Sequence, residues 1–339
     1  MRKLPETRWW IAGLQVPWAA AMVCVLVSAP IGATAQTKAR VPHVGLLALF
    51  APPVGADSAE ERGLREGLRD LGYVEGRNIV VERRYADNRP DRLAAMANEL
   101  VQMKVDVLLT GGQPAREAAR RATSTIPILT VSGSDPVREG WAQSLSRPGG
   151  NVSGLTFTFP ELGPKRLELL KEAFPSVVRV AVLIDPIEVV DAVDVLRETE
   201  AGARRLGLEL QVIKVHGPNE FENAFATARQ QHAQAMFPIA MFPHRDRIAS
   251  MTMRDRLLTV GESQAEAAAG YTITYGADID DLVRRSMTQM DKILKGARVG
   301  DVPIERPTKF RLAVNMKTAK ALGATIANSV LLRADEVIE

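Results

Sequence analysis

Glycine and acidic residues stand directly after several apolar segments of this chain, where they could bind a small polar molecule. Gly111-Gly112 follows the apolar run 105–110, and backbone N–H groups at such a turn can hold a carboxylate at the start of a helix. A tight turn between a strand and a helix, with no ligand, would use the same two glycines. The sequence leaves both interpretations open.

Two Asp-Pro pairs have the same position after an apolar run, at Asp135 and at Asp185. Each carboxylate could bind an ammonium or hydroxyl group, or cap a helix with proline at its first position. Phe50, Phe157 and Tyr275 could stack on a planar or apolar solute, or pack as ordinary core and hinge residues. Only 5% of the chain is aromatic, so three such residues near one predicted site favour a ligand with flat apolar surface.

Residue patterns typical of catalysis or metal binding are missing from the sequence. The four histidines, at His43, His216, His232 and His244, lack the spacing of metal ligands. No G-x-S-x-G, P-loop or G-x-G-x-x-G motif occurs. The single cysteine, Cys24, lies in an apolar N-terminal segment. We therefore expect no catalytic residue, no cofactor and no metal site, and a protein that is not an enzyme.

The N-terminal 35 residues have the composition of a secretory signal. Arg2, Lys3 and Arg8 precede an uncharged stretch that runs from residue 9 to residue 37, with Ala-Thr-Ala at 33–35. A basic start, an apolar core and small residues at positions −3 and −1 predict cleavage after Ala35 and export to the periplasm. An uncleaved membrane anchor is the alternative, since about 20 apolar residues can cross a bilayer.

The charge balance excludes one class of partner. The chain has 43 basic and 40 acidic residues, and removing residues 1–35 takes away three basic residues and one acidic residue, which leaves 40 and 39. A body so close to neutral lacks the basic surface typical of nucleic-acid binding, so we expect no nucleic-acid partner. It also lacks cysteine, which excludes disulfides and thiol catalysis.

Apolar strand-like runs alternate with helix-like segments along the rest of the chain. Strands are expected at 41–49, 78–84, 105–110, 126–131, 178–184, 209–215 and 235–239. Helices are expected at 58–71, 89–104, 114–123, 161–174, 189–206, 219–231 and 245–258. This alternation predicts an α/β protein with parallel sheets built from βαβ units. The stretch 147–151, Arg-Pro-Gly-Gly-Asn, separates two such series and is suited to a crossover or hinge.

Open parallel sheets bind ligands beyond the carboxyl ends of their strands, where backbone N–H groups open the following helices. We therefore expect the ligand contacts in the segments that follow the strands. The predicted ligand-binding residues are Leu49, Phe50, Gly111, Gly112, Gln113, Ser134, Asp135, Thr156, Phe157, Asp185, Met241 and Tyr275.

Many separated runs, in the same order along the chain, carry a family resemblance. They lie at 67–78 (GLRDLGYVEGRN), 104–112, 122–128, 144–155, 165–172, 275–276, 291–296 (DKILKG), 307–310 (PTKF), 317–323 and 333–339. With these runs the sequence resembles the ABC transporter substrate-binding family that includes tryptophan- and aromatic-amino-acid-binding members. The resemblance covers nearly all of the chain after the predicted signal.

The resemblance implies a type I periplasmic-binding-protein fold, with two Rossmann-like α/β lobes joined by three crossovers. The first lobe would take 41–154 and 271–301, and the second 155–270 and 302–339, after a signal peptide at 1–35. Asp185-Pro186 stands where the family often has Asn-Pro, and 269–276 departs from the usual Gly-Gly-Leu before Ser-Tyr-Gly. Because these positions border the cleft, a relative's ligand does not transfer directly to this chain.

These observations together predict a monomeric solute-binding protein of the periplasm. It would capture a small solute, an amino acid or related carboxylate, between its lobes. As the resemblance implies, its partner would be an ABC permease in the inner membrane with a cytoplasmic ATPase. The alternative is a sensor of the same fold that presents its bound solute to a receptor or a histidine kinase.

Overall fold

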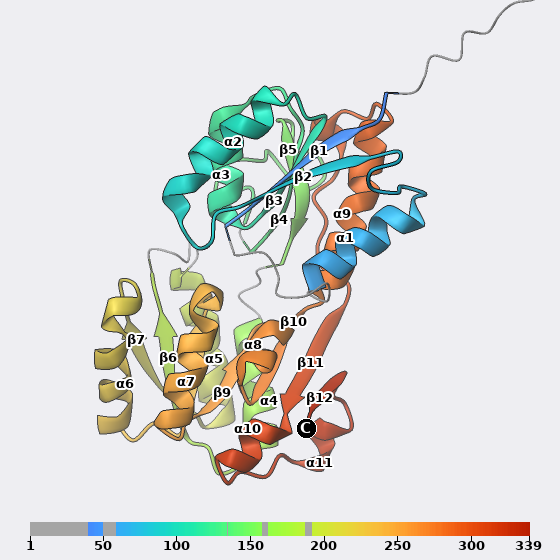
Figure 1. The fold of residues 1–339 in the computed structure, drawn as a ribbon. Coiled ribbons are helices and arrows are strands. Elements are labelled where there is room, and N and C mark those ends of the chain that lie inside the picture. Colours follow the sequence, from blue (N-terminus) through green and yellow to red (C-terminus); the bar gives the residue numbers. More distant parts are fainter. Residues whose placement is uncertain (1–39, 50–58, 134, 158–161, 187–191) are drawn as a thin grey trace, which may run out of the picture. The chain divides into compact units, whose positions relative to one another are not determined.

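A computed structural model describes residues 40–49, 59–133, 135–157, 162–186 and 192–339 (Figure 1). Residues 41–339 form one compact unit. Within it the chain builds two lobes, each an α/β layered structure around its own sheet. The predicted signal segment, 1–35, lies outside the described residues. In the described part of the chain, no helix has the length and apolar character needed to span a membrane.

The sheet of the first lobe is wholly parallel, as the alternation of strands and helices predicted. Its strands are β1 His43–Ala48, β2 Val80–Tyr85, β3 Val107–Gly111, β4 Ile128–Ser132 and β5 Val152–Thr156. The order across the sheet is β2-β1-β3-β4-β5. The central strands are short apolar runs because both faces of a parallel sheet are covered by helices.

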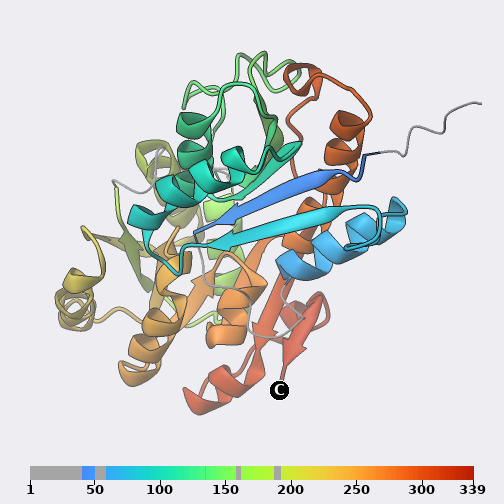
Figure 2. The ribbon, with the colours of Figure 1, turned by 45° about the horizontal axis from the view of Figure 1, so that its top comes forward.

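Two helices cover each face of this sheet. They are α1 Ala59–Asp70 and α9 Ile279–Leu294 on one face, and α2 Leu93–Gln102 and α3 Gln113–Ala122 on the other. Figure 2 shows β1 and β2 side by side with α1 beneath them. Gly63 and Gly67 let α1 approach α9 closely, because a Cβ at these positions would lie 2.6 Å from Asp280 O and from Met287 Cγ.

The sheet of the second lobe has the order β12-β11-β10-β9-β8-β6-β7. Its strands are β6 Arg179–Ile184, β7 Glu209–Lys214, β8 Ala235–Ile239, β9 Leu258–Gly261, β10 Ile273–Ala277, β11 Phe310–Asn315 and β12 Glu336–Ile338. Strands β10 and β11 pair antiparallel and the other pairs are parallel. The chain enters β11 from the first lobe, which reverses the direction of that strand.

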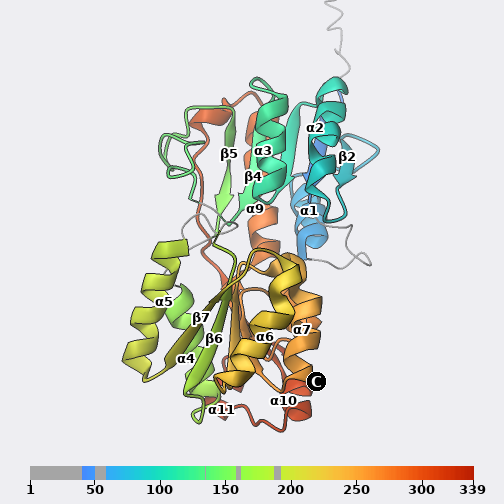
Figure 3. The same cartoon turned by 90° about the vertical axis from the view of Figure 1, so that its left-hand side faces the viewer.

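Helices again cover both faces of the second sheet, as Figure 3 shows for β6 and β7. They are α4 Leu162–Ala173 and α5 Ala192–Leu206 on one face, and α6 Phe221–Gln230, α7 Arg245–Arg254 and α8 Gln264–Ala269 on the other. The short helices α10 Met316–Ala321 and α11 Asn328–Leu331 lie between β11 and β12 in the chain. Single 3-10 turns lie at η1 Pro90–Arg92, η2 Pro218–Glu220, η3 Phe242–His244 and η4 Val299–Asp301.

Two segments pair with the sheet of the other lobe than the one expected for them. Strand β10 pairs with β9, which places residues 271–277 with the second lobe. Glu305 bridges to Leu155, and its carbonyl accepts the N–H of Thr156 at 3.0 Å, which places 302–305 beside β5 in the first lobe. Both differences depend on pairing between distant segments, which a linear pattern does not show. We propose crossings after β5, at Asp278, and between Glu305 and β11.

The turn at 147–151 lies inside the first lobe, so the expectation of a crossover or hinge there is wrong. The Gly149 N–H donates to Gly300 O at 3.0 Å, and the Asn151 side chain donates to Ile126 O at 3.1 Å. Strand β5 then follows in the same sheet. Gly154 permits this pairing, because its φ is +139° and a Cβ would lie 1.9 Å from Thr130 O.

Candidate functional site

The carboxyl ends of the first-lobe strands form one edge, and most of the residues predicted for this lobe lie on it. Ala48 is paired with Gly111, and Ser132 with Thr156, so the segments that follow these strands are neighbours. Phe50 and Ser134 lie outside the described residues. Leu49 is buried in the lobe core, and its carbonyl accepts the Asn88 N–H at 2.8 Å.

The turn after β3 is the tight strand–helix connection that the two glycines allow. Gly112 adopts φ +87° and caps α3, and its N–H donates to Val131 O at 3.3 Å. Gln113 opens α3, and Pro114 in its first turn has no N–H. The anion-binding capacity of this turn is therefore smaller than the Gly-Gly sequence indicates.

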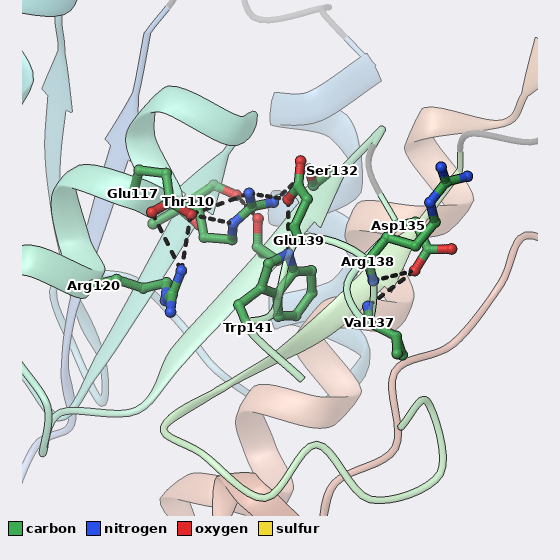
Figure 4. Close-up of polar contacts among 11 residues, drawn as sticks. Thr110, Glu117, Arg120, Ser132, Asp135, Val137, Arg138, Glu139 and Trp141 are labelled. Atoms are coloured by element: carbon green, nitrogen blue, oxygen red, sulfur yellow. Dashed lines mark hydrogen bonds and ion pairs between the residues drawn. The ribbon is translucent and has the colours of Figure 1, made fainter. Parts of the chain in front are cut away.

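Asp135 stabilises the turn that follows β4 (Figure 4). Its Oδ1 accepts the N–H groups of Val137 at 2.9 Å and Arg138 at 3.1 Å. This is a capping role, one of the two interpretations of the Asp-Pro pair, although the segment it caps is a turn and not a helix. Contact between Asp135 and a ligand stays a prediction.

A buried arginine, Arg116 of α3, holds this edge together through Ser132, Glu139 and Trp141, which are labelled in Figure 4. Its side chain is fully buried, donates to Ser132 Oγ at 3.0 Å and forms an ion pair with Glu139. Trp141 Nε1 donates to the same Glu139 carboxylate at 2.9 Å, and the Arg116 guanidinium lies 4.8 Å from the Trp141 ring centroid. Glu117 also accepts from Arg116 at 3.3 Å. The arginine thus ties the end of β4 to the turn that contains Asp135.

The electrostatics of Arg116 reflect its burial. Removal from water lowers the pKa of the guanidinium below its ordinary value, although the carboxylates of Glu139 and Glu117 oppose this effect. One oxygen of Glu139, Oε1, is buried without a hydrogen-bond partner among the described residues. A buried pair of this kind is sensitive to removal of either partner.

Thr156 and Phe157 end the first-lobe sheet at β5. Thr156 is buried, and the Phe157 N–H donates to Ser132 O at 3.1 Å. Both residues therefore lie at the same edge as Ser132 and the turn containing Asp135.

In the second lobe, Asp185 and Met241 follow the neighbouring strands β6 and β8. Ile184 is paired with Ile239, so the two segments start at the same level of the sheet. Asp185 is 7% exposed, and Met241 is 4% exposed in the core cluster beneath α6 and α7. Asp185 therefore supplies a carboxylate at this edge, whereas Met241 contributes mainly its backbone.

Tyr275 lies on β10 and its ring stacks on Phe310 of β11. The ring centroids are 5.9 Å apart and the planes differ by 18°. The Tyr275 side chain is half-buried against the lobe core, which is the packing alternative for this aromatic residue.

A second buried arginine, Arg166 of α4, lies below this edge. It donates to Tyr275 O at 2.8 Å through Nε and to Glu262 Oε1 at 2.7 Å through a terminal nitrogen. Glu262 follows β9, and its other carboxylate oxygen accepts the Ala240 N–H at 2.9 Å. The fully buried Glu266 accepts the N–H groups of Glu262 at 2.5 Å and of Ser263 at 2.8 Å.

One ion pair joins the turn after β4 to the first turn of α5. An Arg138 terminal nitrogen lies 2.5 Å from Asp194 Oδ2, and Arg197 pairs with Asp194 Oδ1 at 2.8 Å. The hydrogen bond from Arg138 holds the pKa of Asp194 below its ordinary value. Charge therefore links the segment that contains Asp135 to the helix that follows β6.

Sequence reasoning missed Arg116, Glu139, Arg166 and Glu262. Their partners are distant in the chain, and an arginine on an amphipathic helix has the appearance of a solvated residue. In the part of the chain that the structure describes, no group of three His, Cys, Asp or Glu residues could hold a metal ion. A hollow of about 310 Å³ lies between α2 and α3, but helix residues such as Ala94 and Ala118 line it and the strand ends do not.

Comparison with known proteins identifies the family. A model of the ABC transporter substrate binding protein family matches residues 52–338, and the chain belongs to that family. The chain is 26% identical over 285 residues to a tyrosine-binding protein of Clostridioides difficile (strain R20291), which covers 83% of this chain and 80% of that protein.

Two crystal structures share the fold. One is an ABC domain in complex with L-Trp from Streptococcus pneumoniae, with a TM-score of 0.76 and 23% identity, covering 88% of this chain and 99% of that one. The other is a conserved domain protein from Vibrio cholerae O1 biovar El Tor, with a TM-score of 0.77 and 24% identity, covering 88% and 100%.

These findings confirm the predicted family and fold class. The protein is a substrate-binding protein of an ABC transporter, with the two parallel-sheet lobes of type I periplasmic binding proteins. Proteins of this family bind small-molecule ligands outside the cytoplasm and work with a transporter permease.

Proposed function

We propose that this protein captures an amino acid, with an aromatic one preferred, and delivers it to an ABC permease of the inner membrane. The observation that carries the proposal is the similarity to a tyrosine-binding protein over 83% of the chain. The L-Trp complex of a protein with the same fold supports the same class of ligand.

The residues at the two strand edges fit the chemistry of an amino acid. Asp185 would bind the ammonium group, since a hydrogen bond between a carboxylate and an ammonium group is charge-assisted and strong. The start of α3 at Gln113 would attract the ligand carboxylate through the helix N-terminus. Phe157 and Tyr275 would contact an aromatic side chain. Asp135 would provide a second acceptor from the first lobe.

The proposal includes the location and the mode of action. The N-terminal signal would be removed after Ala35, and the mature protein would act in the periplasm as a monomer. It would close its lobes on the ligand, as hinged binding proteins do. It would perform no reaction on the ligand, and the cytoplasmic ATPase of the transporter would supply the energy of transport.

Mass spectrometry of small molecules released from protein purified from the periplasm tests this proposal. We expect an aromatic amino acid in the released fraction. A thermal-shift screen with amino acids and sugars gives an independent answer, because a ligand at 100 times its Kd adds about 2.7 kcal/mol of stability. A neutral sugar as the natural ligand would overturn the proposal, and turnover of the captured molecule would overturn the non-enzymatic role.

A further inference from the structure

Three strand ends in the second lobe meet at one charged pair, Arg166 and Glu262. Arg166 is 8% exposed, and its guanidinium donates in two directions, to Tyr275 O at 2.8 Å and to Glu262 Oε1 at 2.7 Å. It also lies 6.0 Å from the ring centroid of Phe237. The planar guanidinium suits this arrangement because its donors point in fixed directions.

Glu262 also contacts the ends of the neighbouring strands β8 and β10. Its Oε2 accepts the N–H of Ala240, the first residue after β8, at 2.9 Å. Ala240 has a φ of +55°, a conformation that costs a non-glycine residue energy and needs external support. The Glu262 carbonyl lies so close to β10 that a Cβ at Gly276 would be 1.7 Å from it. The ends of β8, β9 and β10 are therefore fixed to one carboxylate residue.

The surrounding charges make Arg166 and Glu262 depend on each other for charge balance. The Glu266 carboxylate accepts the Glu262 N–H at 2.5 Å, so two carboxylates and one guanidinium share a largely buried region. Without Arg166, the Glu262 carboxylate would lose its ion-pair partner beside the fully buried side chain of Glu266. Breaking such a pair by removing one partner costs far more than replacing an exposed charge.

We propose that Arg166 and Glu262 form a positioning pair that fixes the ends of β8, β9 and β10 and thereby sets the geometry of the second-lobe half of the ligand site. Met241 follows Ala240 directly, and the Tyr275 carbonyl is itself an acceptor of Arg166. Neither residue of the pair needs to contact the ligand. The inference rests on the proposed function for the identity of the ligand. The geometry of the strand ends, however, can be measured in the protein without a ligand.

Two variants remove the pair in different ways. In Glu262→Gln the side chain keeps its shape, but Arg166 donates to Oε1 and the Ala240 N–H to Oε2. In glutamine one of these two positions becomes an NH2 group, which donates and cannot accept. Arg166→Met removes the charge and retains an unbranched side chain. Arg166→Lys keeps the charge without the second fixed donor and should recover part of the effect. Lys165→Met is the matched control, since Lys165 precedes Arg166 on α4 and pairs only with Glu168 at 3.0 Å among the described residues.

Hydrogen exchange in the ligand-free protein and calorimetry with L-tyrosine and L-tryptophan form the test. We expect the Ala240 amide to lose at least tenfold in protection in Glu262→Gln and Arg166→Met, while the amide of the core residue Val182 keeps its protection. We also expect at least tenfold weaker binding in both variants and less than a twofold change in Lys165→Met. Equal loss of protection at Ala240 and Val182 would indicate a merely structural role.

Unchanged Ala240 protection and unchanged affinity in the folded variants would overturn the inference. If the wild-type protein binds neither amino acid, the proposed function fails separately. The exchange of Ala240 still decides in that case whether the pair fixes the strand ends.

Discussion

The guanidinium of Arg116 lies 4.8 Å from the ring centroid of Trp141, and both side chains donate to the carboxylate of Glu139. This contact joins the beginning of α3 to Trp141, which directly follows the turn after β4. Because Arg116 is fully buried, the carboxylates of Glu139 and Glu117 beside it balance its charge in place of water. The stability of the first lobe should depend on this balance.

We expect Arg116→Met to destabilise the protein by about 3–5 kcal/mol, the cost of leaving a buried carboxylate without its partner. Urea unfolding followed by circular dichroism measures the change. Arg120→Met on the same helix is the control, because Arg120 is partly exposed and pairs with Glu117 at 3.1 Å. Its effect should stay below about 1 kcal/mol. Equal effects of the two substitutions would contradict the account of the buried pair.

Glu266 should make the stability of the second lobe depend on pH. Burial, and then the neighbouring carboxylate of Glu262, raise the pKa of Glu266 from 4.5 to about 7, while Arg166 and the N–H groups of Glu262 and Ser263 oppose the shift. Between these two pH values the unfolded chain has lost the proton and the folded protein still holds it. The contribution of Glu266 is therefore full below pH 4.5 and is lost as the pH rises to about 7.

The variant Glu266→Gln isolates this contribution. Relative to the variant, the wild-type protein should lose on the order of 3 kcal/mol of unfolding free energy as the pH rises through this window. Unfolding curves in urea at intervals between pH 5 and pH 8 measure the difference. Glu168→Gln, at a half-exposed site of the same lobe, should follow the wild-type profile. Parallel profiles for wild type and Glu266→Gln would show that Glu266 is ionised throughout.

Local patterns predicted the architecture well, since strands and helices alternate with clear apolar periodicity. Strand β8 occupies 235–239 as expected, and α7 begins at Arg245 as expected. The pattern gave no strand for β5, β9, β10, β11 or β12. Strands β10 and β11 pair antiparallel, with 32 residues between their facing ends, Ala277 and Phe310. Such pairing depends on the crossovers between lobes, and a linear pattern contains no information on it.

The site could be predicted only as a set of strand ends. Topology alone directs the carboxyl ends of parallel strands to one edge of their sheet. The structure places Gly111 and Thr156 at that edge of the first sheet, and Asp185 at that edge of the second. The residues that hold those edges could not be found in this way. Arg116 and Glu139 are 23 positions apart, and Arg166 and Glu262 are 96 apart, so their pairing exists only in the folded chain.

The exported protein should begin at Gln36. The Ala-Thr-Ala sequence at 33–35 follows an apolar segment, which is the arrangement that signal peptidase cleaves. Intact-mass measurement and N-terminal sequencing of protein recovered from the periplasm check this expectation. A chain that still begins at Met1 and fractionates with the membrane would indicate a retained anchor.

Asp185 should contribute directly to ligand binding. If its carboxylate binds the ligand ammonium, Asp185→Asn should weaken binding by about 1.5–3 kcal/mol, or roughly 10- to 150-fold. Asp255→Asn is the control, because Asp255 belongs to the same lobe, pairs with Arg229 and Arg254, and lies before β9, at the opposite edge of the sheet. Equal affinities in wild type and Asp185→Asn would remove Asp185 from the site.

Isothermal titration calorimetry of the mature chain tests the central claim most directly. Protein unfolded and refolded to remove any captured solute would be titrated with L-tyrosine, L-tryptophan, L-phenylalanine and, for comparison, neutral sugars. The account predicts saturable binding of at least one aromatic amino acid at one site per chain, and no heat of binding from the sugars. Saturable binding of a sugar, with no binding of any amino acid by the correctly refolded protein, would contradict it.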